Sequence, residues 1–326
     1  YKNRFDSVRT GRQDTAAIFV EIAKRIGNPN MQFSFILPFR LFSRKRNHGE
    51  FQVYTLRNFS ILSVLYLGSD VGFSANDEFM ILIMASRIDS QNKINIAFKP
   101  ALENLWDKQI FTKVDQRLLV EKGEVNLNIA RFDVALLKRM SAGCLSLETI
   151  CHVKDGIVPF IREKLVKDKK IDSRYVKFAG IAWHFHLLKY YFRCDDLWLC
   201  YDIKEAMKYI KDKVELRKVQ LRERDIFLHR KILTAQNSAV LKGTIDENKL
   251  FVSNSLHSSY LREECSDKFY LEYILAVINS PAINYFHNSL RQKGTDLHPQ
   301  ILVGDLKKLP IKDITIKEQE PFKELV

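Results

Sequence analysis

The sequence predicts an α/β region followed by a separate α+β region. In the first hundred residues, short apolar runs alternate with segments of helical periodicity, which is the order typical of an α/β sheet. Toward the C-terminus, β-branched runs flank turn-forming residues and an amphipathic helix follows them, which favours an α+β fold. A chain of 326 residues with 46% hydrophobic residues is long and apolar enough for two ordinary domains.

The composition is basic, and the cysteines do not show the pattern of a disulfide-bonded protein. Lysine and arginine outnumber aspartate and glutamate by 52 to 39, a net charge of +13. Such an excess favours a polyanionic partner, although a basic protein that binds no nucleic acid has the same composition. Five irregularly spaced cysteines indicate a reducing compartment, so we expect a cytoplasmic protein. No apolar run approaches the roughly 20 residues that span a bilayer, so no membrane partner is expected.

The α/β region is predicted to begin with a helix at 14–27, which Asp14 caps and Gly27 ends. Three apolar strands, the first two separated by another helix, are expected at 32–38, 61–68 and 78–86. Strands without polar alternation require a sheet that is buried on both faces. Residues 88–140 are predicted to add strands and a short connecting helix, with no function assigned.

The second region is predicted to contain a strand at 145–157, a buried strand within 178–192 and a long helix with a basic face at 201–227. A solvated charged face explains that helix better than contact with phosphates. Residues 230–261 are expected to form a hairpin that turns at 246–248.

The chain ends with an amphipathic helix that stops near an Asn-Ser-Pro break, followed by a Pro-Gln strand. The corresponding sequences are INSPAINYFHNSL at 278–290 and HPQILVGDLKKLPI at 298–311. The first region contains a series of short motifs in a fixed order: Gly11 and Asp14, Phe19, Leu37-Pro38, Leu56-Arg57, Leu67-Gly68 and Phe73. Together these motifs resemble the C-terminal part of TaqI-type adenine-N6 DNA methyltransferases, enzymes of restriction-modification systems such as the type IIG enzymes.

This resemblance implies a division into three parts. Residues 1–99 would be the C-terminal half of a Rossmann-like methyltransferase catalytic domain, and 100–140 a connecting segment. Residues 141–326 would be a DNA target-recognition domain whose partner is double-stranded DNA. Because the chain opens at Tyr1, we expect a fragment of a longer protein, with the catalytic region upstream or on another subunit.

The resemblance also implies residues that touch DNA. Phe73 takes the position of an aromatic that stacks on the adenine rotated out of the duplex, although packing in the local core is the alternative. Within the hairpin, Gln236 and Asn237 carry carboxamides that can pair with the N6 and N7 of adenine. Phosphate contacts are expected from Arg230 and Lys242.

A basic turn precedes the final strand. Arg291 and Lys293 in this turn suit phosphate contact, and Gln300 is expected to fix the turn and to belong to the DNA-binding residues. For the polar residues of the hairpin, the alternative is that they contact only water, because surface hairpins are generally polar.

The family's cofactor and catalytic motifs are missing from this sequence. Neither the Gly-rich turn that binds S-adenosylmethionine nor an Asn/Asp-Pro-Pro-Tyr/Phe motif is present, and Asn28-Pro29-Asn30-Met31 lacks the second proline and the aromatic. We therefore expect no cofactor on this chain, no catalytic residue within it, and S-adenosylmethionine in the parent enzyme. No metal is expected, because the spacing of His184, His186, Cys194 and Cys200 fits no common zinc site.

Three functions remain open from the sequence. The chain is the DNA-recognition part of an adenine methyltransferase, a stand-alone DNA-specificity module that guides a separate methyltransferase or nuclease subunit, or an interaction fragment that does not bind DNA. A catalytic motif shortly before Tyr1 would distinguish the first from the second.

Overall fold

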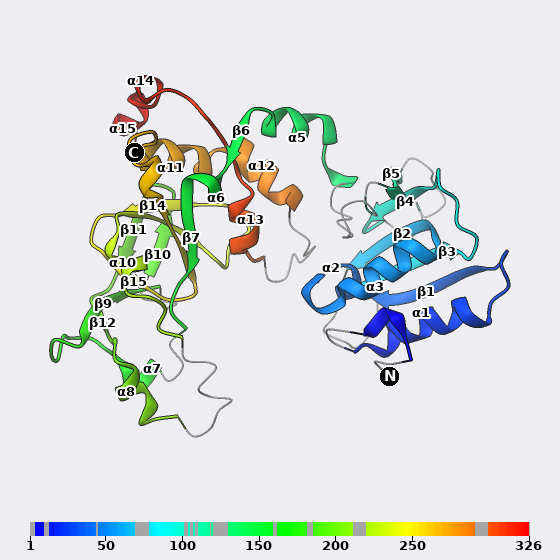
Figure 1. The fold of residues 1–326 in the computed structure, drawn as a ribbon, viewed down its shortest axis with the longest axis horizontal. Helices are drawn as coiled ribbons and strands as arrows, with labels where there is room; N and C mark the ends of the chain where they lie inside the picture. Colours follow the sequence, from blue (N-terminus) through cyan, green and yellow to red (C-terminus); the bar gives the residue numbers. More distant parts are fainter. Residues whose placement is uncertain are drawn as a thin grey trace. The chain divides into compact units, whose positions relative to one another are not determined.

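The computed structural model describes residues 4–9, 13–43, 45–68, 78–100, 104, 107, 110–117, 119, 130–158, 162–180, 185–210, 220–290 and 299–325. The chain divides into two compact units: unit 1 is Tyr1–Val134 with Ser289–Thr295, and unit 2 is Ala135–Asn288 with Asp296–Val326. Several separate sheets combined with helices make this a mixed α/β protein (Figure 1).

Unit 1 is built on a mixed five-stranded sheet in the order β1-β3-β2-β4-β5. Its strands are β1 (Gln32–Pro38), β2 (Ser60–Gly68), β3 (Phe79–Ala85), β4 (Lys93–Phe98) and β5 (Thr112–Asp115). Strand β3 is antiparallel to both β1 and β2, so β1 and β2 are parallel to each other. Parallel strands need a crossover connection, and helix α3 (Lys45–Asn58) lies in the connection between them.

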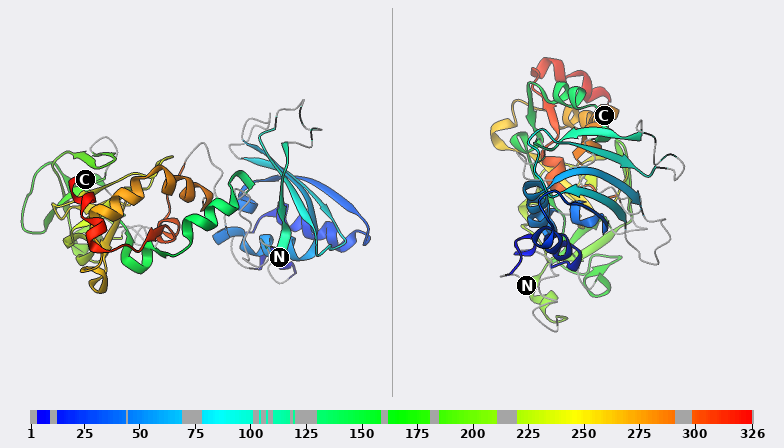
Figure 2. Two further views of the ribbon diagram at one scale, coloured as in Figure 1. Left: turned by 90° about the horizontal axis from the view of Figure 1, so that it is seen from above. Right: turned by 90° about the vertical axis from the view of Figure 1, so that its right-hand side faces the viewer.

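One core joins the helices of unit 1 to its sheet (Figure 2). Helix α1 (Thr15–Ile26) begins as predicted, because the Asp14 carboxylate accepts a hydrogen bond from Ala16 N at 3.1 Å, and Gly27 ends it. The short elements η1 (Asp6–Val8) and α2 (Arg40–Ser43) flank these helices. The core combines Val20 of α1, Phe51 and Leu56 of α3, and Met80, Leu82 and Met84 of β3.

The opposite face of the unit 1 sheet is only partly buried. Ile36 is 56% exposed, and Ile81 beside it on β3 is partly exposed. Side chains alternate across a strand, so the residues that point away from α1 and α3 share this face. Within the described residues, the sheet therefore has one buried face, whereas the sequence predicted two.

Unit 2 is organised around an antiparallel sheet in the order β14-β13-β16-β7. Its strands are β7 (Cys151–Asp155), β13 (Lys231–Ala235), β14 (Gly243–Asp246) and β16 (Leu256–Leu261). Neighbouring residues of β13 face two different cores. Ile232 packs with Ile274 of helix α11 (Leu271–Asn279), whereas Leu233 packs with Phe178 of the second sheet.

The second sheet of unit 2 has the order β15-β9-β12-β8. The remaining strands are β6 (Cys144–Ser146), β8 (Val166–Lys167), β9 (Tyr175–Ala179), β10 (Phe185–Leu188), β11 (Tyr191–Cys194), β12 (Leu197–Cys200), β15 (Phe251–Val252) and β17 (Pro310–Lys312). The helices of this unit, besides α11, are α5 (Val134–Ser141), α6 (Leu147–Ile150), α7 (Arg162–Leu165), α8 (Ile203–Met207), α10 (Asp225–Leu228), η5 (Glu263–Cys265), α12 (Pro281–Leu290), α13 (Val303–Lys307), α14 (Ile316–Gln319) and α15 (Pro321–Leu325). None of the described helices is long and apolar enough to cross a membrane.

The Asn-Ser-Pro break and the connecting helix lie where they were expected. Helix α11 ends at Asn279, Ser280 is its C-cap, and α12 begins at Pro281. Proline suits the first position of a helix because its missing N–H would have no partner there. Helix α5 occupies the expected position of the short connecting helix.

Four predicted elements of unit 2 are wrong. The buried strand within 178–192 is instead a hairpin of β10 and β11, whose Leu188 is 58% exposed. The Pro-Gln strand is a single bridge at Gln300, and helix α13 follows it.

The strand at 145–157 is interrupted by helix α6, which brings Leu147 and Ile150 to the same core; both are 0% exposed. The long helix at 201–227 is limited in the described residues to α8 and α10. The backbone of Gln220 pairs with Val158 instead, with N···O distances of 3.0 and 3.3 Å.

The hairpin turn was also predicted at the wrong place. The antiparallel strands β13 and β14 are joined by residues 236–242, called the 236–242 loop from here on. Asp246, expected in the exposed turn, is 0% exposed and opposes Lys231 across the pair of strands. The residues after Asp246 lead to β15, which belongs to the second sheet.

Lys231 and Asp246 form a fully buried ion pair. Lys231 Nζ lies 2.5 Å from Asp246 Oδ2 and donates a second hydrogen bond to Phe227 O at 2.9 Å. Asp246 Oδ2 also accepts a hydrogen bond from Leu250 N at 2.8 Å. Burial lowers the pKa of Lys231, and the carboxylate opposes that shift.

We predict that Lys231→Met destabilises the protein by about 3–5 kcal/mol, because the variant leaves the Asp246 charge buried without its partner. Denaturant unfolding of the full chain measures the effect. Lys204→Met is the control: this exposed side chain should cost less than about 0.5 kcal/mol. Equal stability of the two variants would contradict the assignment.

Candidate nucleic-acid interface

The 236–242 loop brings three of the predicted DNA-contacting residues together. Gln236 and Asn237 stand at its start, and Gln300 forms an antiparallel bridge with Asn237. Ile301 N donates to Gln236 O at 2.7 Å, and Gln236 N donates to Ser255 O at 2.8 Å. Both backbone groups of Gln236 are thus occupied, so its position is fixed by the main chain.

Unlike the backbone of this loop, three of its side chains make no hydrogen bond or ion pair within the described residues. These side chains belong to Gln236, Asn237 and Lys242. Asn237 is exposed, whereas Gln236 and Lys242 are partly exposed. A fixed backbone that carries two uncommitted carboxamides and a cation can offer hydrogen bonds to an external ligand at low entropic cost.

His257 fastens the segment that carries Gln300. Its Nε2 lies 2.8 Å from Ile301 O, and its Nδ1 lies 2.9 Å from Asp155 Oδ1. A carbonyl oxygen therefore lies beside one ring nitrogen and a carboxylate oxygen beside the other. The hydrogen bond from His257 lowers the pKa of Asp155. The bond from His257 to Ile301 thus reaches across to the C-terminal segment.

Two asparagines hold the other end of the loop. Asn279, which is 2% exposed, accepts a hydrogen bond from Gly243 N at 2.8 Å and donates one to Gly243 O at 3.1 Å. Asn284 Oδ1 accepts a hydrogen bond from Leu241 N at 2.9 Å. Sequence reasoning did not single out either residue, although Asn279 belongs to the Asn-Ser-Pro motif that it used to place the helix break.

The segment that contains this loop matches a known protein family. Residues 189–311 match the TaqI-like C-terminal specificity domain. The specificity domain therefore includes the 236–242 loop, Asn279 and Gln300. The match confirms, for these residues, the family resemblance seen in the sequence.

Two solved structures align with most of the chain at low similarity. The type IIG restriction endonuclease BpuSI has 13% sequence identity and a TM-score of 0.43, over 99% of this chain and 45% of that one. The type IIL restriction-modification enzyme MmeI, solved in complex with DNA, has 10% identity and a TM-score of 0.49, over 91% and 41%. The chain thus spans less than half the length of either protein. No curated protein sequence matches it.

Arg230, expected to hold phosphate, is already paired within the specificity domain. Its Nη2 lies 2.7 Å from Glu247 Oε1 and 2.7 Å from Glu272 Oε1. A phosphate would have to compete with these two carboxylates for the guanidinium. Arg230 also stands at the opposite end of β13 from Gln236, so the structure does not bring it to the 236–242 loop.

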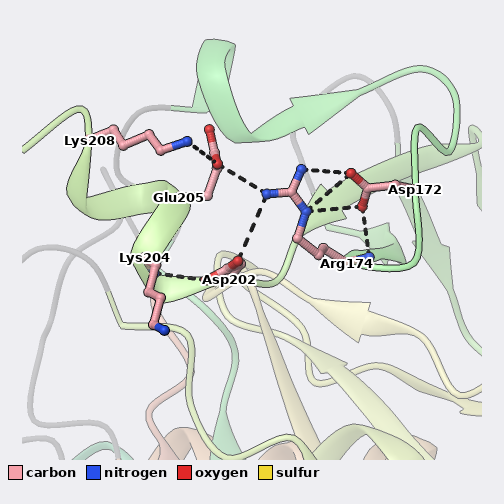
Figure 3. A network of polar contacts seen from close by, with 6 residues as sticks. All are labelled: Asp172, Arg174, Asp202, Lys204, Glu205 and Lys208. Atoms are coloured by element: carbon pink, nitrogen blue, oxygen red, sulfur yellow. Dashed lines mark hydrogen bonds and ion pairs between the residues drawn. The ribbon is translucent and has the colours of Figure 1, made fainter.

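A second group of basic residues in unit 2 is similarly engaged by carboxylates (Figure 3). Arg174 pairs with Asp172 at 2.6 Å and with Glu205 at 3.1 Å, and Lys208 pairs with Glu205 at 2.8 Å. Hydrogen bonds from Arg174 lower the pKa of Asp172. This network joins the start of β9 to helix α8. Its positive charges are paired with carboxylates of the same unit.

Three predicted contact residues cannot be placed. Phe73, Arg291 and Lys293 lie outside the described residues. Their roles stay predictions of the family resemblance. No cluster of histidine, cysteine or carboxylate residues suited to a metal occurs in the described part of the chain, which leaves out His184.

We predict that Asn279→Ala destabilises the protein by about 1–3 kcal/mol, because Gly243 loses both hydrogen bonds to the Asn279 side chain and its carbonyl keeps only the bond from Tyr190 N. Trypsin cleavage after Lys242 should also become faster, since the loop end is released. Thermal unfolding and timed proteolysis measure the two effects. Asn248→Ala, at an exposed position, is the matched control. Unchanged cleavage in Asn279→Ala would show that Asn279 does not hold the loop.

Proposed function

We propose that this chain is the DNA-recognition part of an adenine-N6 DNA methyltransferase from a restriction-modification system. The observation that carries the proposal is the 236–242 loop, whose backbone is fixed at both ends while its carboxamides remain uncommitted. In the major groove a carboxamide can make one bidentate contact with adenine, because its N–H donates to N7 and its oxygen accepts from the N6 amino group. The match of 189–311 to a specificity domain supports the same assignment.

The two kinds of side chain in the loop would divide the work. Gln236 and Asn237 would contact base edges, which distinguish sequences, and Lys242 would contact phosphate, which sets register without reading sequence. Gln300 is held beside Asn237 and would stabilise the loop rather than bind alone. The net charge of +13 supports attraction of a polyanion.

Unit 1 would be the C-terminal half of a Rossmann-like methyltransferase sheet. The parallel strands β1 and β2 with a helix in their connection support this, because such crossovers build Rossmann-like sheets. The edge of β1 pairs with no other described strand, so the sheet would continue there, and the partly exposed face around Ile36 would be covered by further elements. An upstream catalytic region, on this polypeptide or on a separate subunit, would complete it.

We also propose that this chain does not bind S-adenosylmethionine. Asn28-Pro29-Asn30 forms the turn between α1 and β1, where Asn28 Oδ1 accepts a hydrogen bond from Asn30 N at 3.0 Å. That side chain closes its own turn, which supports a structural role. We therefore propose that the cofactor belongs to the parent enzyme and that no methyl transfer step uses this chain alone.

The purified chain is accordingly predicted not to bind S-adenosylmethionine. Titration calorimetry with the cofactor should give only heats of dilution. A stoichiometric site of micromolar affinity would overturn this part of the proposal without touching the DNA-binding part.

Duplex DNA is predicted to bind the chain weakly, with an affinity that falls steeply as salt rises. Lys242→Ala should weaken binding to all duplexes equally and flatten the slope of log K against log salt by about one. Gln236→Ala should leave that slope unchanged. In the parent enzyme on its own target, Gln236→Ala should instead lower discrimination by ~1–3 kcal/mol at one base pair.

Fluorescence anisotropy with several duplexes at two or more salt concentrations measures these effects. Lys204→Ala, an exposed lysine outside the loop, is the control for loss of a single charge. Absence of duplex binding even at low salt would contradict the function. Identical behaviour of Gln236→Ala and Lys242→Ala would contradict the division of roles.

A further inference from the structure

The β10–β11 hairpin ends in a strained turn. Leu188 pairs with Tyr191, so Lys189 and Tyr190 alone form the connection between the strands. Tyr190 has φ +64°, in the left-handed region where a bulky L-residue is a rare outlier. Backbone strain of this kind persists only where surrounding contacts hold it, and it is concentrated at functional sites.

Two contacts hold the strained turn against the 236–242 loop. Tyr190 N donates to Gly243 O at 2.9 Å, and Lys189 Nζ donates to Asn279 O at 2.5 Å. Gly243 directly follows Lys242, and its backbone is also bound by the side chain of Asn279. The hairpin tip is therefore attached to the end of the loop that carries the candidate phosphate-binding lysine.

The tip presents its rings to solvent. Tyr190 is 41% exposed and Tyr191 60% exposed, and Leu188 beside them is 58% exposed. The hairpin nevertheless has a buried side, because Leu187 is only 6% exposed and lies in a core of unit 2. The exposed side chains thus lie on one face of the hairpin, where Leu188 and Tyr191 are opposite each other on the two strands.

The charge around these rings favours a nucleic acid over a protein or a neutral ligand. Residues 185–194 and 235–245 include Lys189, Arg193 and Lys242 but no aspartate or glutamate. Cations interspersed with exposed aromatic rings are the combination that binds single-stranded nucleic acid, because phosphates meet the charges and base faces stack on the rings. An intact duplex hides those faces, so the rings suit bases that have left the stack.

We infer that the Tyr190–Tyr191 tip is a stacking platform for unpaired bases next to the 236–242 loop. The inference rests on the proposed function, because it assumes that the loop faces DNA. It extends that function to a second feature of the DNA, a distorted base step. The unstacked bases of this step would stack on the two tyrosine rings. Tyr190 and Tyr191 would thus favour DNA that is already opened over intact DNA.

Fluorescence anisotropy with two DNA probes of the same length tests this inference. One is a fully paired duplex, and the other contains a central bubble of mismatched pairs. The wild-type chain should bind the bubble roughly fivefold or more tightly, as expected for stacking of one or more bases. Combined Tyr190→Gly and Tyr191→Thr should remove that preference but leave binding of the paired duplex and its salt slope unchanged.

These substitutions are chosen to preserve the hairpin. Glycine accepts the left-handed backbone of position 190, and threonine retains the strand propensity of position 191. Tyr191→Trp keeps an aromatic ring and should retain the preference for the bubble. Tyr209→Thr removes another exposed tyrosine of unit 2, 38% exposed, and should behave as wild type. Unchanged thermal unfolding confirms that each variant is folded.

The outcomes separate this inference from the proposed function. If the wild type binds neither probe, the proposed function fails and the inference fails with it. If the wild type binds both probes equally, or if the double variant keeps the preference for the bubble, only the stacking platform is overturned. An equal loss for both probes in the double variant would also overturn it, because it would indicate contact with the DNA backbone and not with base faces.

Discussion

The pair of hydrogen bonds between the Asn279 carboxamide and the backbone of Gly243 is the constraint on which the candidate interface depends. It joins the end of helix α11 to the first residue of β14, and so fixes one end of the 236–242 loop. The carbonyl of Gly243 also accepts the N–H of Tyr190, and the carbonyl of Asn279 accepts the ammonium of Lys189. A buried amide thus positions a helix, a loop and a hairpin tip. Its loss would remove the hydrogen bond to the buried Gly243 N–H and leave the Gly243 carbonyl with the N–H of Tyr190.

The other end of the same strand pair is fixed by charge. Lys231 and Asp246 are both 0% exposed and lie opposite each other on β13 and β14. Burial of the two ions costs desolvation energy, and hydrogen bonds from Leu250 N and to Phe227 O help to offset it. The strand pair is therefore fixed both where it begins and where it reaches the loop. Rigid support below uncommitted side chains is the arrangement that keeps the entropic cost of recognition low.

Local signals in the sequence predicted those elements whose ends depend on near neighbours. Asp14, Gly27 and the Asn-Ser-Pro break act through hydrogen bonds or fixed dihedral angles within a few residues, and the structure confirms all three. The turn at 246–248 was wrong because Asp246 has a partner 15 residues away, which no local propensity reveals. The helix at 201–227 was wrong because the backbone of Gln220 pairs with Val158. Gln236, Asn237 and Gln300 could be suspected from residue type, but their proximity arises from the bridge between distant segments.

The central claim is that the 236–242 loop faces DNA. Hydrogen–deuterium exchange with and without a saturating duplex tests it most directly, because the amides of Asn237, Ala239 and Lys242 report on the loop itself. The account predicts that duplex slows exchange within 236–242, while exchange in α8 and around Arg174, whose charges are paired internally, remains unchanged. Protection confined to α8 and the Arg174 network, with no change in the loop, would contradict it.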